Sequence, residues 1–316
     1  HRIIRCKLKV FIWQKNDNME TIRSIIRGDL PPVGNPIKRG PRSQCKLGIE
    51  GYHANWVDSG TSALALALIA ARRSRPNIAN PEVIIPGYCC PDLVSACVFA
   101  GCTAKLVDLR ADGWGLDPLQ LRQALSENTL AVIGVNFLGI REDWPELHSI
   151  INQSHPEIVT IEDSAQWFPD LNQPNAFTSD YVVFSFGKGK PLSLLNGGAL
   201  FSQKPILDIY QSTVNTQQPT AYWILQSKYF LFNQILKPNI YWALNNNPIL
   251  KPGKTIYKPL HALHSLDSTR LDLLQVNYQQ YLKNLNDSWR SYDNHLSNIN
   301  FENCIFPKNR FRIKHL

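Results

Sequence analysis

The chain has 316 residues, of which 44% are hydrophobic and 18% are charged, and its formal net charge is +8. This length and apolar content are enough to bury a large core, arranged as one large domain with a smaller companion. No run of about twenty apolar residues occurs, which excludes a membrane-spanning helix. Beyond the first fifty positions the basic residues are scattered, so we interpret them as solvated surface charge and not as a nucleic-acid site.

The cysteines and histidines indicate neither a disulfide framework nor a metal site. The seven cysteines are an odd number, include the adjacent pair Cys89–Cys90, and show no zinc-binding spacing. The eight histidines also fall in no metal-ligand spacing. We therefore predict a protein of the reducing cytoplasm with no bound metal.

The N-terminal part of the chain contains a candidate start, a short helix and a loop. Met19 is the only methionine, and the residues before it lack the cleavage pattern of a secretory signal, so Met19 is a candidate for the natural start. A short amphipathic helix is predicted over residues 19–27. Residues 31–52 are rich in proline, glycine and basic residues, which is typical of a loop.

The first motif follows a short strand that ends at Trp56–Val57. The extended segment ends at Gly60, and an alanine- and leucine-rich helix follows, predicted over residues 61–73. Backbone N–H groups at such a helix start point at an anion, and the helix dipole adds to the attraction. Gly60, Thr61 and Ser62 are therefore candidate phosphate ligands, although the two hydroxyls also fit a simple helix cap.

Strands and helices then alternate along the chain. The predicted strands are 82–86, 103–108, 130–136, 157–162, 181–184 and 199–201, and the predicted helices are 92–100, 117–126 and 143–153. This order predicts a mostly parallel sheet with helices on both faces. Asn136 ends one of these strands, where it would contact either a ligand or, equally well, its own turn.

A second motif is the acidic pair Glu162–Asp163, which lies at the carboxyl end of an apolar strand. Ligands of open α/β sheets bind at this edge. A carboxylate there can pair with a protonated pyridine nitrogen and make the ring an electron sink. The alternative interpretation of Asp163 is a helix N-cap.

The third motif is the turn of residues 184–192, which contains Lys188 and Lys190 and lies between two apolar strands. Burial disfavours the charged form of an amine, which suits a nucleophile that forms a Schiff base. Taken alone, the stretch favours an exposed loop with two lysines and several glycines. Phosphate cradle, carboxylate and lysine together are the three groups that hold pyridoxal 5'-phosphate (PLP).

As a set, these motifs resemble the PLP-dependent nucleotide-sugar aminotransferases of the DegT/DnrJ/StrS type, which have fold type I. The matching segments recur in family order across roughly residues 50–203 and are 59–64, 83–88, 107–108, 162–166, Phe184-Ser185-Phe186 with Lys190, and Gly197–Gly198.

The resemblance implies an α/β fold with a mostly parallel seven-stranded sheet flanked by helices and a smaller C-terminal α+β domain. We expect an N-terminal arm and loop at 1–50, a large PLP-binding domain at 51–203 and a small domain at 204–316. The small domain would contain an aromatic-rich helix at 221–236 and a long helix at 266–297. Family members are usually longer, so we expect the small domain to be incomplete. The resemblance also implies a homodimer.

Family spacing assigns the cofactor-bearing lysine. It lies four residues after the second phenylalanine of the motif, which selects Lys190 over Lys188. By the same resemblance Asp163 would pair with the pyridine nitrogen, Gln166 would reach the phenolic oxygen, and Ser185 would join Gly60, Thr61 and Ser62 around the phosphate.

One position departs from the family. An aromatic residue in the turn after strand 82–86 usually stacks on the PLP ring, and its place aligns with Cys90. Either Tyr88, two residues earlier, supplies the stacking face or the ring packs on a thiol. Tyr88 packed on the sheet as an ordinary turn residue is an equal alternative.

The resemblance implies transfer of an amino group from an amino acid, L-glutamate, to a keto-sugar. The sugar would be nucleotide-linked and serve surface polysaccharide or lipopolysaccharide synthesis. The family's sugar dehydratases have a histidine in place of Lys190, which argues against that activity. A non-catalytic or regulatory homologue is the other alternative, motivated by Cys90 and by the missing asparagine in the loop of residues 264–270.

Overall fold

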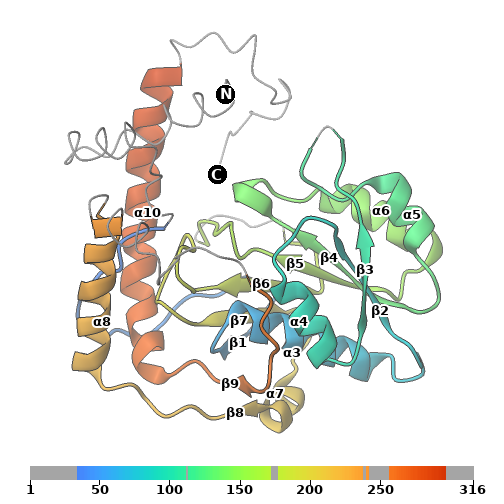
Figure 1. Ribbon diagram of the computed structural model, residues 1–316, viewed down its shortest axis with the longest axis horizontal. Coiled ribbons are helices and arrows are strands. Elements are labelled where there is room, and N and C mark those ends of the chain that lie inside the picture. The colour runs from blue at the N-terminus through green and yellow to red at the C-terminus, as the bar shows by residue number, and fades with distance from the viewer. Residues whose placement is uncertain (1–33, 112, 172–176, 238–239, 242–255, 297–316) are drawn as a thin grey trace.

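The computed structural model describes residues 34–111, 113–171, 177–237, 240–241 and 256–296 (Figure 1). The helix predicted at 19–27 lies outside these residues. The described part of the chain contains a seven-stranded sheet with the strand order β1-β7-β6-β5-β4-β2-β3. Its strands are β1 (His53–Val57), β2 (Glu82–Pro86), β3 (Thr103–Val107), β4 (Thr129–Val135), β5 (Val159–Asp163), β6 (Tyr181–Ser185) and β7 (Gly198–Ser202).

Most neighbouring strands are parallel, as predicted. Strands β3, β2, β4, β5 and β6 pair in parallel, whereas β7 pairs antiparallel with both β6 and β1. A turn, residues 186–197, joins β6 to β7 without a crossover helix, and such a connection returns the chain antiparallel. This turn carries both lysines of the third motif.

The helices agree with the predicted ones to within a few residues at each end, except that α7 (Leu207–Thr213) was not predicted. They are α3 (Gly60–Ser74), α4 (Asp92–Phe99), α5 (Pro118–Ala124), α6 (Trp144–Ser154), α7 (Leu207–Thr213), α8 (Tyr222–Ile235) and α10 (Ser268–Leu296). A 3-10 turn, η1 (Phe137–Gly139), follows β4, and the two short strands β8 (Val214–Asn215) and β9 (Leu263–His264) pair in parallel. Within the described residues, no helix has the length and apolar character needed to cross a membrane.

The alternation of side chains along each strand creates the layers. In β2, Val83 and Ile85 belong to a core beneath α3 and α4, whereas Ile84 faces α5 and α6 on the other side. In β6, Val183 joins the α3 core, and Phe184 joins a separate aromatic core beneath α8 and α10. Figure 1 shows α8 and α10 side by side at one end of the sheet.

Helix α3 is buried on nearly every side. Its alanine–leucine stripe lies in the core as predicted, and Ala65, Leu66 and Ala70 are also buried, because α4 and several strands surround it. The helix begins at a capped end, where Ser59 Oγ accepts a hydrogen bond from the Ser62 amide at 3.0 Å. The start of α3 therefore has a fixed position at the sheet edge.

Helices α8 and α10 pack directly on the sheet. Leu225, Tyr229, Leu273 and Tyr278 share one apolar cluster with Phe184. The division of the chain at residue 203 into a large and a small domain stays a prediction.

Candidate active site

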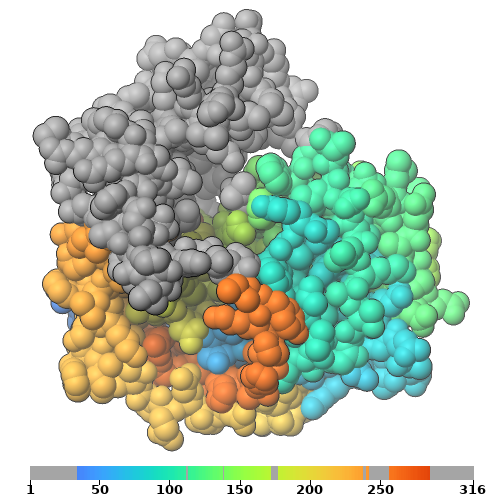
Figure 2. All heavy atoms as spheres, viewed as in Figure 1, coloured from blue at the N-terminus to red at the C-terminus, as the bar shows by residue number. Residues whose placement is uncertain are grey.

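A cavity of about 270 Å³ opens at the carboxyl edge of the parallel strands. Its lining comes from the start of α3, the turn before α4, the ends of β4, β5 and β6, and the turn after β6. This is the edge at which open α/β sheets bind ligands, and the volume is near the lower end for small-molecule sites. Nearby, residues 256–264 cross the surface beside α4 (Figures 1 and 2), held by a 2.7 Å hydrogen bond from Ser95 Oγ to the Lys258 carbonyl.

Most of the predicted site residues line this cavity. They are Gly60, Thr61, Asp163, Gln166, Ser185 and Lys190, together with Lys188. They come from positions up to 130 residues apart in the sequence and are brought together by the parallel sheet. Two other predicted residues, Ser62 and Tyr88, lie outside the lining.

The turn at the start of α3 is packed tightly against β6 and β7. A Cβ atom on Gly60 would lie 2.7 Å from Ser185 Cβ, and one on Gly198 would collide with the backbone of Ser59. Glycine at both positions therefore lets the α3 turn approach the sheet. The N–H groups of Gly60 and Thr61 begin α3 and lie at the cavity, where they can bind an anion.

The hydroxyl of Ser62 belongs to a cap network, which was the alternative interpretation of this residue. Ser62 Oγ donates to Asp58 Oδ1 at 2.6 Å and is fully buried. The 2.8 Å contact between the Ser59 and Ser62 hydroxyls must then use the hydrogen of Ser59. Both hydrogens are committed, so the hydroxyl donors of the cavity lining that remain for an anion are those of Thr61 and Ser185.

Asp163 ends β5 with its side chain on the α3 side of the sheet. It is 4% exposed, and its Oδ1 accepts a hydrogen bond from the Ala165 amide at 2.9 Å. A turn and no α-helix follows it, so Asp163 caps a turn where the alternative interpretation had a helix. Burial raises the pKa of Asp163, while the Ala165 amide and the positive charge of Lys190 oppose the rise. A cationic partner would therefore stabilise the ionised form of this buried carboxyl group.

Glu162, the other member of the acidic pair, points to the opposite face. It is fully buried and accepts two hydrogen bonds from Arg141, at 2.8 and 3.1 Å. Asn136 Nδ2 donates to Glu162 Oε1 at 2.9 Å and to Ser164 Oγ at 2.7 Å, and Asn136 Oδ1 accepts from the Glu142 amide. The Asn136 side chain is therefore hydrogen-bonded to protein groups, as its alternative interpretation had it, and links the end of β4 to the strand end that carries Asp163.

The turn of residues 186–197, which we call the lysine turn, is compact around its two lysines. The Lys190 amide donates to the Gly187 carbonyl at 3.3 Å, and Gly189 has a φ of +76°, which glycine adopts without strain. Lys188 is exposed and Lys190 is half-buried, and both line the cavity. Of the two, it is Lys190 whose charge acts on Asp163.

Tyr88 points away from the cavity. It is 64% exposed, and its ring meets Phe137 edge-on with 5.3 Å between the ring centroids. Cys89, Cys90 and Phe137 line the cavity in its place. Burial raises the pKa of Cys89 to about 11, and it also raises the pKa of Cys90. Both thiols are therefore neutral near pH 7 and present a polarizable, uncharged wall.

Phe137 and Asp92 also line the cavity, although the sequence analysis did not select them. Phe137 directly follows the Asn136 strand end, and Asp92 begins α4 directly after the Cys89–Cys90 turn. Both follow the carboxyl end of a predicted parallel strand, and this position was the available signal. Within the described residues, no group of three or more histidine, cysteine, aspartate or glutamate side chains is arranged to hold a metal ion.

Comparison with known proteins gives a consistent result. The model of the DegT/DnrJ/EryC1/StrS aminotransferase family matches residues 16–217. Protein MosB of Rhizobium meliloti is 28% identical over 207 residues, covering 61% of this chain and 40% of MosB. The UDP-4-amino-4,6-dideoxy-N-acetyl-β-L-altrosamine transaminase of Campylobacter jejuni is 24% identical over 191 residues, covering 58% of this chain and 48% of the transaminase. The chain thus spans less than half of the length of these two curated relatives.

Among solved structures, a Streptococcus pneumoniae protein assigned as a sugar aminotransferase superposes with a TM-score of 0.52. The match covers 90% of this chain and 69% of that protein at 19% sequence identity. It confirms the predicted fold type of the chain.

Proposed function

The chain belongs to the DegT/DnrJ/EryC1/StrS aminotransferase family, and on that premise we propose that it is a PLP-dependent aminotransferase. It moves an amino group from an amino acid, L-glutamate, to a nucleotide-linked keto-sugar for surface polysaccharide or lipopolysaccharide synthesis. The observation that carries the proposal is the single cavity lined by Lys190, Asp163 and the start of α3.

The residues of the cavity fit this cofactor. The close approach of Gly60 to Ser185 forms a cradle in which backbone N–H groups and two hydroxyls can surround a phosphate. Asp163 supplies a buried carboxylate to this cavity, and Lys190 supplies an amine. When bound, PLP supplies an electron sink that weakens the bonds at the amino carbon of the substrate.

Each residue then has a defined task. The Gly60 turn and Ser185 would anchor the phosphate, and Asp163 would accept a hydrogen bond from the protonated pyridine nitrogen and stabilise its charge. Lys190 Nζ would hold the cofactor covalently, and its amine would serve as the base that moves a proton at the substrate carbon. Gln166 would contact the phenolic oxygen. The wall of Cys89, Cys90 and Phe137 supplies the packing surface for the ring, in place of Tyr88.

Two alternatives give different outcomes. A sugar dehydratase of this family would have a histidine at position 190, and the lysine favours aminotransfer. A non-catalytic homologue would not bind the cofactor covalently. In the loop that lacks the asparagine, Arg270 forms an ion pair with Asp267 and a hydrogen bond with Thr220, so these polar groups are used within the chain.

Two further features stay proposals. A homodimer is supported by the exposed apolar side chains Trp223, Phe230 and Leu231 of α8, and sedimentation would test it. A cytoplasmic location is supported by the free thiols of the described cysteines, which are Cys45, Cys89, Cys90, Cys97 and Cys102.

The decisive test is covalent capture. Wild-type protein is mixed with PLP, reduced with borohydride, digested and analysed by mass spectrometry. We expect the label on Lys190, its loss in Lys190→Ala, and its retention in the matched variant Lys188→Ala. A label on Lys188 would move the role to that residue, and an unlabelled wild-type protein would support the non-catalytic homologue. A panel of amino acids and keto-sugar nucleotides then identifies the donor and the acceptor.

A further inference from the structure

Residues 34–46, which we call the strap, cross α8 and α10 without regular secondary structure. Two asparagine side chains fix the strap by its backbone. Asn233 of α8 accepts from the Ile37 amide and donates to the Ile37 carbonyl, both at 2.8 Å. Asn277 of α10 does the same for Lys38, at 2.7 and 3.2 Å. Each amide pairs with one residue of the strap as a neighbouring strand would, so the strap is held firmly on both helices.

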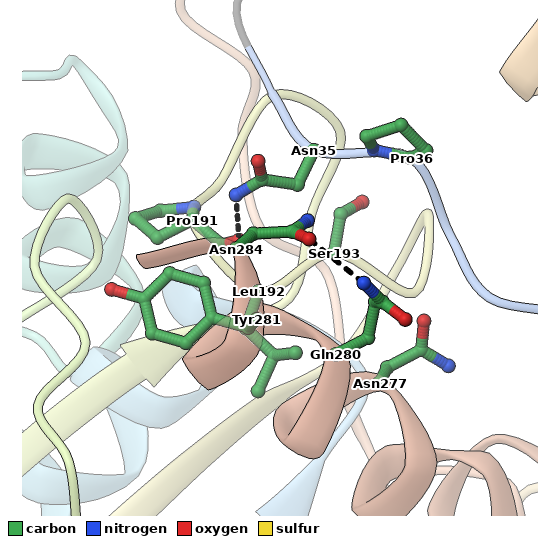
Figure 3. A pocket seen from close by; sticks show the side chains of 9 residues that line it. All are labelled: Asn35, Pro36, Pro191, Leu192, Ser193, Asn277, Gln280, Tyr281 and Asn284. Atoms are coloured by element: carbon green, nitrogen blue, oxygen red, sulfur yellow. Dashed lines mark hydrogen bonds between the residues drawn. The ribbon is translucent and has the colours of Figure 1, made fainter. Parts of the chain in front are cut away.

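The N-terminal end of the strap contacts the lysine turn. Asn35 Nδ2 donates to the Pro191 carbonyl at 2.7 Å, directly after Lys190 (Figure 3). A Cβ atom on Gly34 would lie 2.9 Å from Gly189 Cα, directly before Lys190. Gly34 has a φ of +130° and Gly189 a φ of +76°. The strap therefore touches the backbone on both sides of Lys190.

Polar side chains complete this contact. A pocket of about 10 Å³ lies between the strap, the lysine turn and α10, and Figure 3 shows Asn35, Ser193, Asn277, Gln280 and Asn284 around it. Such a volume admits one water molecule and no larger ligand. The side of the lysine turn that faces away from the active-site cavity is thus closed by polar groups, and a loss of Asn35 would open it.

We propose that Gly34 and Asn35 are positioning residues that hold the lysine turn so that the amine of Lys190, and not that of Lys188, is presented to the cofactor. The backbone on either side of Lys190 is fixed by the strap, and the strap is fixed by α8 and α10. Because Lys188 and Lys190 are only two positions apart, the position of the lysine turn decides which of the two amines reaches the cofactor. This inference rests on the proposed function for its consequence, but the contact itself can be tested without cofactor.

The first experiment measures backbone hydrogen exchange in the protein without added cofactor. Asn35→Ala removes the hydrogen bond to Pro191, so peptides covering residues 187–192 should exchange roughly 2- to 10-fold faster than in the wild type. Gly34→Ala, which forces the two backbones apart, should have the same effect. The matched control is Asn55→Ala, which deletes an amide-to-carbonyl bond to Leu200 on β7 and should leave these peptides unchanged. Equal exchange in Asn35→Ala and wild type would overturn the proposal.

The second experiment measures which lysine is captured by PLP and borohydride. In Asn35→Ala the ratio of label on Lys190 to label on Lys188 should fall at least about 3-fold, whereas Asn55→Ala should keep the wild-type ratio. A general loss of stability lowers both labels together and leaves the ratio unchanged, and that result would also overturn the positioning role. If the wild type is not labelled at all, the proposed function fails, and the exchange comparison still decides whether the strap holds the turn.

Discussion

A Cβ atom placed on Gly60 would lie 2.7 Å from the Cβ atom of Ser185, a separation that real side chains do not adopt. The start of α3 and the end of β6 are therefore as close as two segments of backbone and side chain can be. The donors of the proposed phosphate cradle can converge on one anion only because these two segments lie so close together.

Gly60→Ala should force α3 and β6 apart and lower the free energy of unfolding by about 1–3 kcal/mol. It should also lower the affinity for PLP, because the donors of the cradle no longer converge. Urea denaturation and a PLP titration measure the two effects. Gly48→Ala is the matched control, since a Cβ atom there meets nothing within 4 Å. Unchanged PLP affinity in Gly60→Ala would refute the cradle.

The hydroxyls near the cradle should differ in importance. Ser185→Ala removes a donor to a charged phosphate, so PLP affinity should fall by about 10-fold or more. Ser62→Ala should leave PLP affinity within about 3-fold, because the Ser62 hydroxyl is committed to Asp58. Equilibrium titration of the two variants checks the difference, and equal losses would contradict the assignment of Ser62 to the cap network.

Asp163→Asn should make the cofactor-free protein more stable at neutral pH while weakening cofactor binding. Burial raises the pKa of Asp163, so the native state binds more protons than the unfolded state above the ordinary carboxyl range. The contribution of Asp163 to the stability of the wild type is therefore fully present below pH 3.8, the ordinary pKa of the carboxyl group. This contribution is lost as the pH rises through the raised pKa of Asp163 in the folded state. The asparagine stays neutral and keeps the Oδ1 that accepts from Ala165.

Thermal unfolding of wild type and Asp163→Asn between pH 4 and pH 8 measures this contribution. The gap in Tm in favour of Asp163→Asn should widen with rising pH. A variant that is less stable than the wild type throughout this range would show that the Asp163 carboxylate is well compensated even without cofactor.

The ion pair of Arg141 and Glu162 should matter far more than the surface pairs. Arg141→Ala leaves the fully buried Glu162 without its cation and removes the packing on Trp167 and Phe177, so about 3–5 kcal/mol of stability should be lost. The control Lys105→Ala breaks the half-exposed pair with Glu82 and should cost about 0–1 kcal/mol. Urea denaturation of both variants gives the comparison. Similar losses would mean that Glu162 finds other compensation.

The sheet and its edge could be predicted from the sequence because their signals are local. Apolar runs identify buried strands, and Asp163 and Ser185 are placed at the same edge by the parallel order alone. The opposite directions of Glu162 and Asp163 follow from the alternation of side chains along a strand, which the sequence also contains. The choice of Asp163 as the cavity residue rested instead on the family resemblance.

The contacts that depend on tertiary packing could not be predicted in this way. Tyr88 is exposed and meets Phe137 edge-on, and Phe137 belongs to a different strand connection, so this contact is not visible in the local sequence. The strap's own residues predict only a loop, since its partners Asn233 and Asn277 lie about two hundred residues further along the chain. Nothing in a proline- and glycine-rich stretch indicates that helix side chains will supply its hydrogen bonds.

The pairing of Asn277 with Lys38 has a consequence for tolerance to sequence change. The amide recognises only the peptide N–H and C=O of position 38, and the Lys38 side chain is exposed. Any residue that keeps an N–H group can therefore occupy this position without loss of the contact, whereas proline, which has none, cannot. Position 38 should therefore accept many residue types, and proline is excluded by the chemistry of the main chain and not by that of a side chain.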